Sequence, residues 1–123
     1  MAAAAAVIAL AAGGCGGGSS APATTAPASG AQIVTAKETE YEIALSTMTL
    51  HPGTVTFRAV NDGSITHALA ISGPGLSEKS TPNFPAGQVS SLTVTLTKPG
   101  HYMPWCPVDG HRRLGMVTEI TVR

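Results

Sequence analysis

A chain of 123 residues is short enough that a single domain is expected. Seven Lys and Arg residues balance seven Asp and Glu residues, and this balance gives no electrostatic reason to expect a nucleic acid as partner. Only 11% of the residues are charged and 43% are hydrophobic. Much of the hydrophobic fraction is alanine near the N-terminus, so we expect a modest core in the part that folds.

Residues 2–12 form an apolar run that is too short to span a bilayer and is typical of the core of a signal peptide. The run leads into Ala12-Gly13-Gly14-Cys15, and small residues before a lone cysteine resemble a bacterial lipobox. The leucine usual three places before the cysteine is absent. We expect residues 1–14 to be a signal peptide and Cys15 to be lipidated. The exported protein would then be anchored by its lipid to the outer face of the bacterial cell membrane, or would lie in the periplasm. A plain secretory signal with an incidental cysteine is the alternative.

Residues 15–31 contain, after Cys15, only Gly, Ser, Ala, Pro and Thr. Without charge or apolar periodicity, such a segment cannot offset the entropy lost on folding. We expect a flexible tether with a reach on the order of 20 Å, which would hold a domain just off a membrane surface.

From residue 32 onward apolar and polar residues alternate, and turn residues separate the alternating runs. The runs lie around residues 41–45, 55–59, 65–71, 92–96, 102–106 and 120–122. The segment 73–87, rich in Gly and Pro, is expected to be a long loop, and no segment shows a helical period. Short strands separated by Gly and Pro turns predict an all-β sandwich or barrel for residues 32–123.

A thiol, an imidazole and a thioether follow one another in Cys106, His111 and Met116, with the spacing C-x4-H-x4-M. A second imidazole, that of His67, lies about forty residues upstream on an expected strand. Two imidazoles and a thiolate suit copper in both oxidation states, and a thioether is the usual weak axial partner. We expect the loop that starts at Cys106 to hold three ligands while His67 comes from the neighbouring strand.

Each of these residues also has a simpler interpretation. His67 could be a core histidine bonded to backbone, and Met116 could fill a gap in the core. Cys106 could pair with Cys15, although a disulfide would tie the core to the tether and consume the thiolate. The combination of His67 with the loop favours a metal site over all three.

The chain here resembles the cupredoxin family, which includes plastocyanins and azurins, and most closely its rusticyanin-like and auracyanin-like bacterial members. The resemblance covers about Glu38 to Arg123. It rests on residues 52–57, the Asn61-x-Gly63 turn, the His67 strand, residues 98–102 and the ligand loop. It implies a Greek-key β-sandwich of seven to eight strands and one type 1 copper ion. The implied ligands are His67, Cys106, His111 and Met116.

One position departs from the family pattern. Many members have Asn directly after the upstream histidine, where it braces the ligand loop by hydrogen bonding. Here that residue is Ala68, so another group has to brace the site, and Thr66 and Ser64 are the candidates.

The resemblance implies an electron carrier of the cell envelope that cycles between Cu(I) and Cu(II) and is not an enzyme. A protein for copper delivery or storage is the alternative, but it would need an exposed cluster of Met or His, and the four His and four Met are scattered. A copper oxidase or nitrite reductase would need His-x-His pairs for a further copper centre, and none occurs.

The resemblance also implies that electrons pass through the edge of His111, which in the family lies under an apolar patch. Two arginines follow His111 and would place positive charge at the rim. The expected docking surface comprises Pro107, Val108, Arg112, Arg113 and Leu114. We expect a monomer that docks to an acidic or membrane-associated redox partner.

Overall fold

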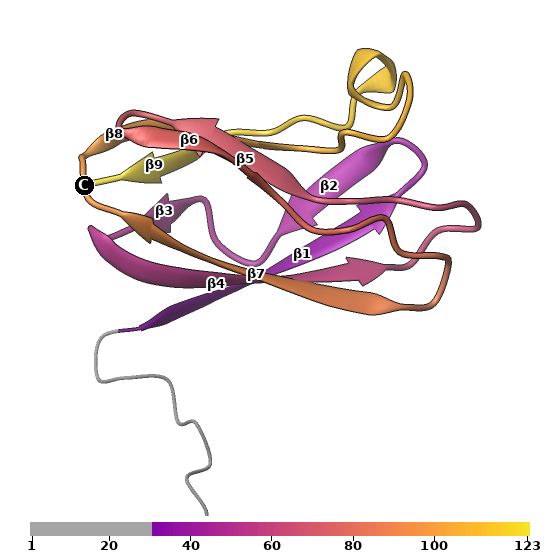
Figure 1. The fold of residues 1–123 in the computed structure, drawn as a ribbon, viewed down its shortest axis with the longest axis horizontal. Coiled ribbons are helices and arrows are strands. Elements are labelled where there is room, and N and C mark those ends of the chain that lie inside the picture. The colour runs from indigo at the N-terminus through magenta and orange to yellow at the C-terminus, as the bar shows by residue number, and fades with distance from the viewer. Residues whose placement is uncertain (1–30) are drawn as a thin grey trace, which may run out of the picture.

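The computed structural model describes residues 31–123 (Figure 1). The predictions for the signal peptide, for Cys15 and for residues 16–30 of the tether lie outside the described residues. In the described part the chain forms two facing sheets, and its one helical element is the short 3-10 turn η1 (Arg112–Leu114). No helix in residues 31–123 has the length and apolar character needed to cross a membrane.

Nine strands in the described part form the two sheets. The first sheet has the order β2-β1-β4-β7 and comprises β1 (Gln32–Thr39), β2 (Glu42–Leu45), β4 (Gly53–Asn61) and β7 (Val89–Leu96). The second has the order β3-β9-β8-β5-β6 and comprises β3 (Thr49–Leu50), β5 (Ala70–Gly73), β6 (Leu76–Ser80), β8 (Gly100–Trp105) and β9 (Ile120–Val122). The pairs β1–β4 and β3–β9 are parallel, and the other pairs are antiparallel. The prediction of an all-β sandwich is confirmed, with one or two more short strands than the seven to eight expected.

The core lies between the two sheets and is built from residues that alternate along the strands. On β4, Val55, Phe57 and Ala59 are wholly buried, whereas Thr54 and Arg58 on the opposite face are exposed. Burying one of the larger apolar side chains stabilises the folded state by about 1.5–3 kcal/mol. Buried residues from the second sheet meet this face, among them Ile71, Tyr102, Ile120 and Val122.

Two segments differ from the sequence prediction. Residues 65–71 were expected to be one strand, but β5 begins only at Ala70, and His67 joins Phe84 through an isolated bridge. Residues 67–71 are all buried, and a segment covered on every side does not alternate as a half-buried strand does. The expected loop 73–87 contains β6, whose only apolar residue is the half-buried Leu76. A strand without a hydrophobic stripe gives no period-two signal.

A buried carboxylic acid lies at the inner face of β1. Glu38 continues the inward series of Val34 and Ala36, and it pairs in register with Asn61 of β4. Its side chain is wholly buried, and neither carboxylate oxygen has a hydrogen-bond partner among the described residues. Burial raises the pKa of Glu38 to about 8. The group is therefore protonated in the folded protein at neutral pH.

This raised pKa predicts that the metal-free protein loses stability as the pH rises from about 5 to 8. The unfolded chain releases the Glu38 proton near its ordinary pKa, whereas the folded chain keeps it up to about pH 8. The contribution to the free energy of unfolding should fall by about 1.4 kcal/mol per pH unit across this window. Glu38→Gln should remove this slope, and Glu42→Gln, at an exposed position of β2, should not. Urea unfolding at several pH values measures both, and parallel curves for wild type and Glu38→Gln would contradict the prediction.

Candidate metal centre

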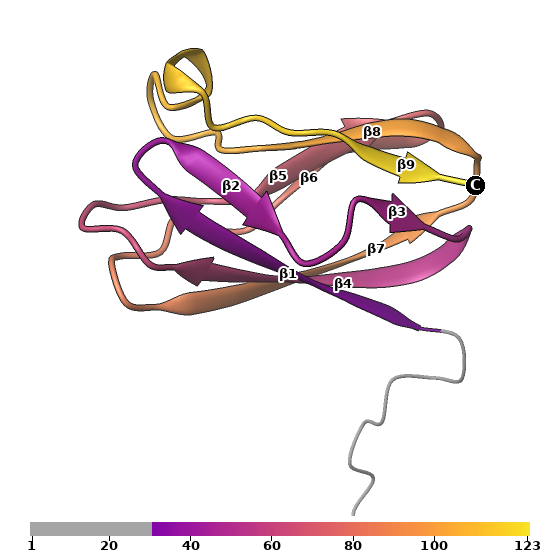
Figure 2. The same cartoon turned by 180° about the vertical axis from the view of Figure 1, so that it is seen from behind.

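The segment from Cys106 to Met116 forms a closed loop at one end of the second sheet, where it carries η1 (Figures 1 and 2). Its two ends are joined, because the Cys106 N–H donates to the Met116 carbonyl at 3.0 Å. Inside the loop, the His111 N–H donates to the Val108 carbonyl at 3.0 Å, and the Met116 N–H donates to the His111 carbonyl at 3.1 Å. Gly115 ends η1 with a φ of 119°, a backbone conformation that residues with a side chain rarely adopt. These bonds fix the loop as a rigid unit.

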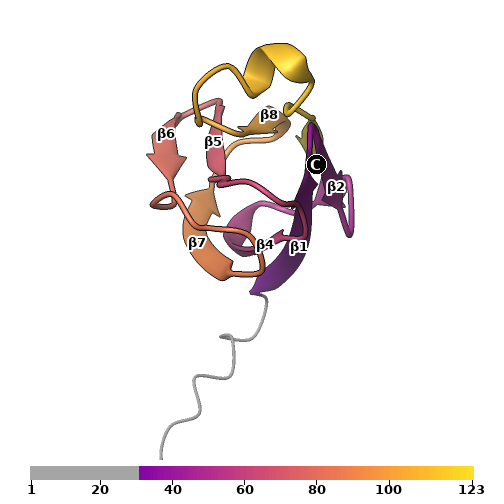
Figure 3. The same cartoon turned by 90° about the vertical axis from the view of Figure 1, so that its right-hand side faces the viewer.

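His67 reaches the same place from the segment before β5. Its N–H donates to the Phe84 carbonyl at 3.1 Å, and the Phe84 N–H donates to the His67 carbonyl at 2.8 Å. The bridge fixes the backbone on both sides of the ring. End-on, the ligand loop lies over β8 and β5 (Figure 3).

The three donor atoms of His67, Cys106 and His111 lie within 4.8 Å of one another. The Nδ1 atoms of the two histidines are 3.3 Å apart, and the Cys106 Sγ lies 3.5 Å from the His111 Nδ1. Donors bonded to one metal at about 2.0–2.3 Å, with angles between tetrahedral and trigonal, are separated by roughly 3.3–3.8 Å. The spacing therefore fits a single ion bound by two nitrogens and one sulfur.

The three side chains are almost fully shielded from solvent. Cys106 and His67 are wholly buried, and His111 is 7% exposed. Burial raises the pKa of the Cys106 thiol, although the N–H groups of Ala68 and Val108 act in the opposite direction by bonding to its sulfur. Burial also lowers the pKa of His67, so its ring is neutral at pH 7, the form that binds metal. A metal ion would supply the positive charge that a buried thiolate needs.

Met116, the fourth predicted ligand, lies at the end of the loop and is wholly buried. Its backbone contacts both Cys106 and His111, so the side chain starts beside the cluster. We treat the role of Met116 as a fourth, weaker ligand below as a proposal.

The prediction that Thr66 or Ser64 braces the site, in place of the side chain that Ala68 lacks, is wrong. Among residues 31–123, neither the Thr66 nor the Ser64 hydroxyl makes a hydrogen bond. The Nε2 atom of His67 instead lies 3.2 Å from Oε1 of Glu40, and the backbone N–H of Ala68 bonds to the Cys106 sulfur. Sequence reasoning missed Glu40 because no spacing relates it to His67, and only the parallel pairing of β1 with β4 brings it near.

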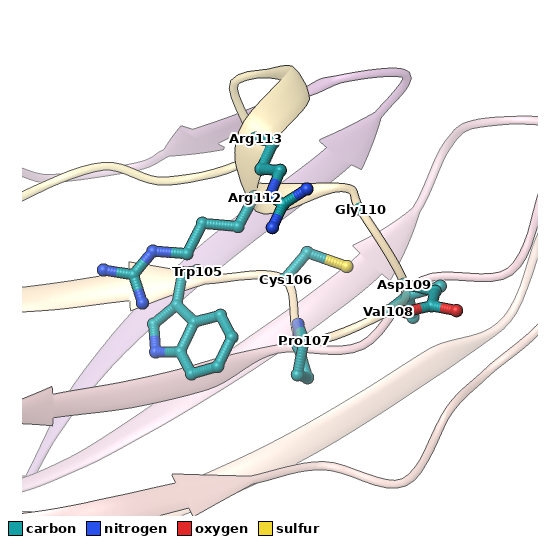
Figure 4. Close-up of a pocket in the computed structure, with 8 residues that line it drawn as sticks. All are labelled: Trp105, Cys106, Pro107, Val108, Asp109, Gly110, Arg112 and Arg113. Carbon is teal, nitrogen blue, oxygen red and sulfur yellow. The ribbon is translucent and has the colours of Figure 1, made fainter.

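Four of the five predicted docking residues, Pro107, Val108, Arg112 and Arg113, line a pocket beside the loop (Figure 4), whereas Leu114 is not among its lining residues. Pro107 and Val108 are half-buried, whereas Leu114 is 57% exposed. The Arg112 guanidinium lies over the Trp105 ring, 4.7 Å from its centre, which is cation–π distance. Tyr41, which was not predicted, packs its ring edge-on to His111 with the centres 5.4 Å apart.

Comparison with solved structures gives the same fold. A reduced auracyanin from the photosynthetic bacterium Roseiflexus castenholzii superposes with a TM-score of 0.60 at 21% identity, covering 78% of this chain and 98% of that one. Auracyanin A, a "blue" copper protein from Chloroflexus aurantiacus, superposes with a TM-score of 0.62 at 20% identity, covering 76% and 100%. A multicopper oxidase superposes with a TM-score of 0.58 at 13% identity, and this chain covers 45% of it.

No protein-family model and no curated protein matches the sequence. The similarity to the auracyanins is therefore a similarity of fold. Residues 31–123 have the cupredoxin fold, and their buried His, Cys and His donors fit the type 1 copper site of that fold.

Proposed function

We propose that this protein is a one-copper electron-transfer protein. The observation that carries the proposal is the convergence of the His67, Cys106 and His111 donor atoms in a buried cluster. Bound copper would supply a one-electron couple between Cu(I) and Cu(II). The auracyanin A neighbour, with which this chain shares its fold, is a "blue" copper protein.

The residues of the site would bind a metal ion and shield it from water. His67 and His111 would bind through Nδ1, Cys106 through its sulfur, and Met116 as a weaker axial ligand. The hydrogen-bonded loop and the Phe84 bridge hold the ligand backbones in place. Rigid ligands keep a similar geometry in both oxidation states, and this reduces the reorganisation that accompanies electron transfer.

The burial of the ligands argues against the alternative of copper delivery or storage, which requires an ion that exchanges readily. An oxidase role is disfavoured as well. The described residues hold one cluster of metal-ligating side chains, and the sequence has no His-x-His pair for a further copper centre.

The copper proposal predicts an intensely blue oxidised protein, because a thiolate bonded to Cu(II) gives a strong charge-transfer absorption. Cys106→Ser and His67→Ala should abolish the colour, whereas His101→Ala should keep it, because that histidine is exposed on β8. Visible and electron paramagnetic resonance spectra of the copper-loaded protein provide the measurement. A wild-type protein that binds one equivalent of Cu(II) and stays colourless would refute the type 1 assignment.

We also propose that electrons pass to a redox partner across the outer face of the loop. His111 is 7% exposed, and Leu114 beside it is 57% exposed. Arg112 and Arg113 are both exposed and supply positive charge. Because Arg112 lies over Trp105, its charge is held toward that side of the loop. An acidic partner would be attracted to this rim.

Replacing Arg112 and Arg113 together with Ser should slow electron transfer to an anionic oxidant such as hexacyanoferrate. We expect a decrease of roughly two- to tenfold at low ionic strength, and similar rates for variant and wild type at high salt. Arg58→Ser, on β4 of the other sheet, is the matched control and should have little effect. Stopped-flow measurement at several salt concentrations tests this, and equal rates at low salt would show that the arginine pair plays no part in docking.

We further propose that the protein is exported and anchored at the membrane through a lipid on Cys15. The support is the apolar run and the small residues before Cys15 in the sequence. The Gly-, Ala- and Pro-rich residues that follow would act as the tether.

The anchor proposal predicts that Cys15→Ala moves the protein from the membrane fraction to the soluble fraction of bacterial cells. Cys106→Ala is the matched control, since it removes the other cysteine and should leave the distribution unchanged. Fractionation followed by immunoblotting provides the measurement. If wild type and Cys15→Ala distribute equally, the lipid anchor is ruled out.

A further inference from the structure

Glu40 lies in the turn between β1 and β2, and its carboxylate contacts the segment that leads to His67. Its Oε1 accepts the N–H of Ser64 at 2.8 Å and that of Ile65 at 3.1 Å. The side chain is only 27% exposed. Two backbone donors on one oxygen hold the carboxylate in a single place.

The loop is shaped around this carboxylate. Gly63 has no side chain where a Cβ would overlap the Glu40 carboxylate. Asn61 fixes the same turn, because its Oδ1 accepts the Gly63 N–H at 3.0 Å and its Nδ2 donates to the Ile65 carbonyl at 2.8 Å. A larger residue at position 63 would displace the carboxylate, so the close approach depends on glycine.

The same oxygen contacts the far nitrogen of the His67 ring. The distance from Oε1 to Nε2 is 3.2 Å, while Nδ1 of the ring faces His111 and the donor cluster. A neutral imidazole carries one proton, and an acceptor at Nε2 holds the proton on that nitrogen. The lone pair of Nδ1 is then free for a metal ion. Carboxylates that orient a metal-binding histidine in this way change metal affinity by about 10–100-fold.

We propose that Glu40 is the positioning residue of the metal site, fixing the tautomer and orientation of His67 from a strand turn that is remote in sequence. The proposal rests on the metal site described above, but it concerns a feature of the protein that exists before metal binds. The negative charge of the carboxylate also favours the more highly charged Cu(II) over Cu(I).

The first experiment determines the His67 tautomer in the metal-free full chain by nitrogen-15 NMR at about pH 8, where the ring is neutral. Wild type should show the proton on Nε2. Glu40→Ala should give a mixture of tautomers. Gly63→Ala should do the same without changing any charge, because the new methyl group displaces the carboxylate. Glu42→Gln, which removes a nearby exposed charge, should match wild type.

The second experiment measures Zn²⁺ affinity and, for the copper-loaded protein, the reduction potential. Glu40→Ala should weaken Zn²⁺ binding by about 10–100-fold. Glu40→Gln keeps an oxygen acceptor for Ser64 and Ile65, so it should fold, lose less affinity and raise the reduction potential. Glu42→Gln should change neither quantity.

A wild-type His67 protonated on Nδ1 would overturn the proposal. So would a Glu40→Ala variant with the wild-type tautomer and a Zn²⁺ affinity within about twofold of Glu42→Gln. If the copper-loaded wild type is colourless while tautomer and Zn²⁺ affinity still depend on Glu40, the electron-transfer function fails and the positioning role stands.

Discussion

The burial of the Cys106 sulfur is the constraint on which the rest of the site depends. A thiolate removed from water is costly, and here burial raises the pKa of the thiol. Two backbone N–H groups, from Ala68 and Val108, point at the sulfur and offset part of that cost. They come from the two segments that also carry His67 and His111. The same backbone that stabilises the thiolate therefore delivers the two imidazoles, and the donor set forms as one unit.

The strand register determines what surrounds this unit. β1 and β4 pair in parallel, with Glu38 opposite Asn61, so the chain leaving β1 meets the turn that follows β4. Two glutamates only two residues apart consequently differ in their surroundings and in their charge. Glu38 points into the core, lacks a partner among the described residues and keeps its proton at neutral pH. Glu40 lies past the end of the strand, where bonds from the Ser64 and Ile65 N–H groups lower its pKa and keep it charged.

The difference between contacts that are local in sequence and contacts made by strand pairing explains which parts of the fold and the site could be predicted from the sequence. The donors Cys106, His111 and Met116 lie within eleven residues, and their types and spacing carry a local signal that His67 completes. The sandwich was predictable from alternation on β4 and β8, where one face is buried and the other exposed. The role of Glu40 was not predictable, because it arises from the pairing of strands more than ten residues apart. Nor was β6, an edge strand of mostly polar residues, because it shows no period of two. Residues 65–71 do alternate in sequence, but the structure buries all of residues 67–71 and starts β5 only at Ala70.

The two ends of the sandwich differ in how well their buried polar groups are satisfied. Away from the ligand loop, the Tyr102 hydroxyl donates to the carbonyls of Pro74 and Lys98, at 2.9 and 2.8 Å. At the loop end, Cys106 and two histidines are buried against one another, and the Glu38 carboxyl on β1 of the facing sheet has no partner among the described residues. The three donor side chains contact mainly one another, at 3.3 Å between the two Nδ1 atoms and 3.5 Å between Cys106 Sγ and His111 Nδ1, and a metal ion that binds them in the folded state alone would stabilise that state. Metal binding and folding are therefore linked at the loop end of the sandwich, because the donors meet there only when both sheets and the loop are in place.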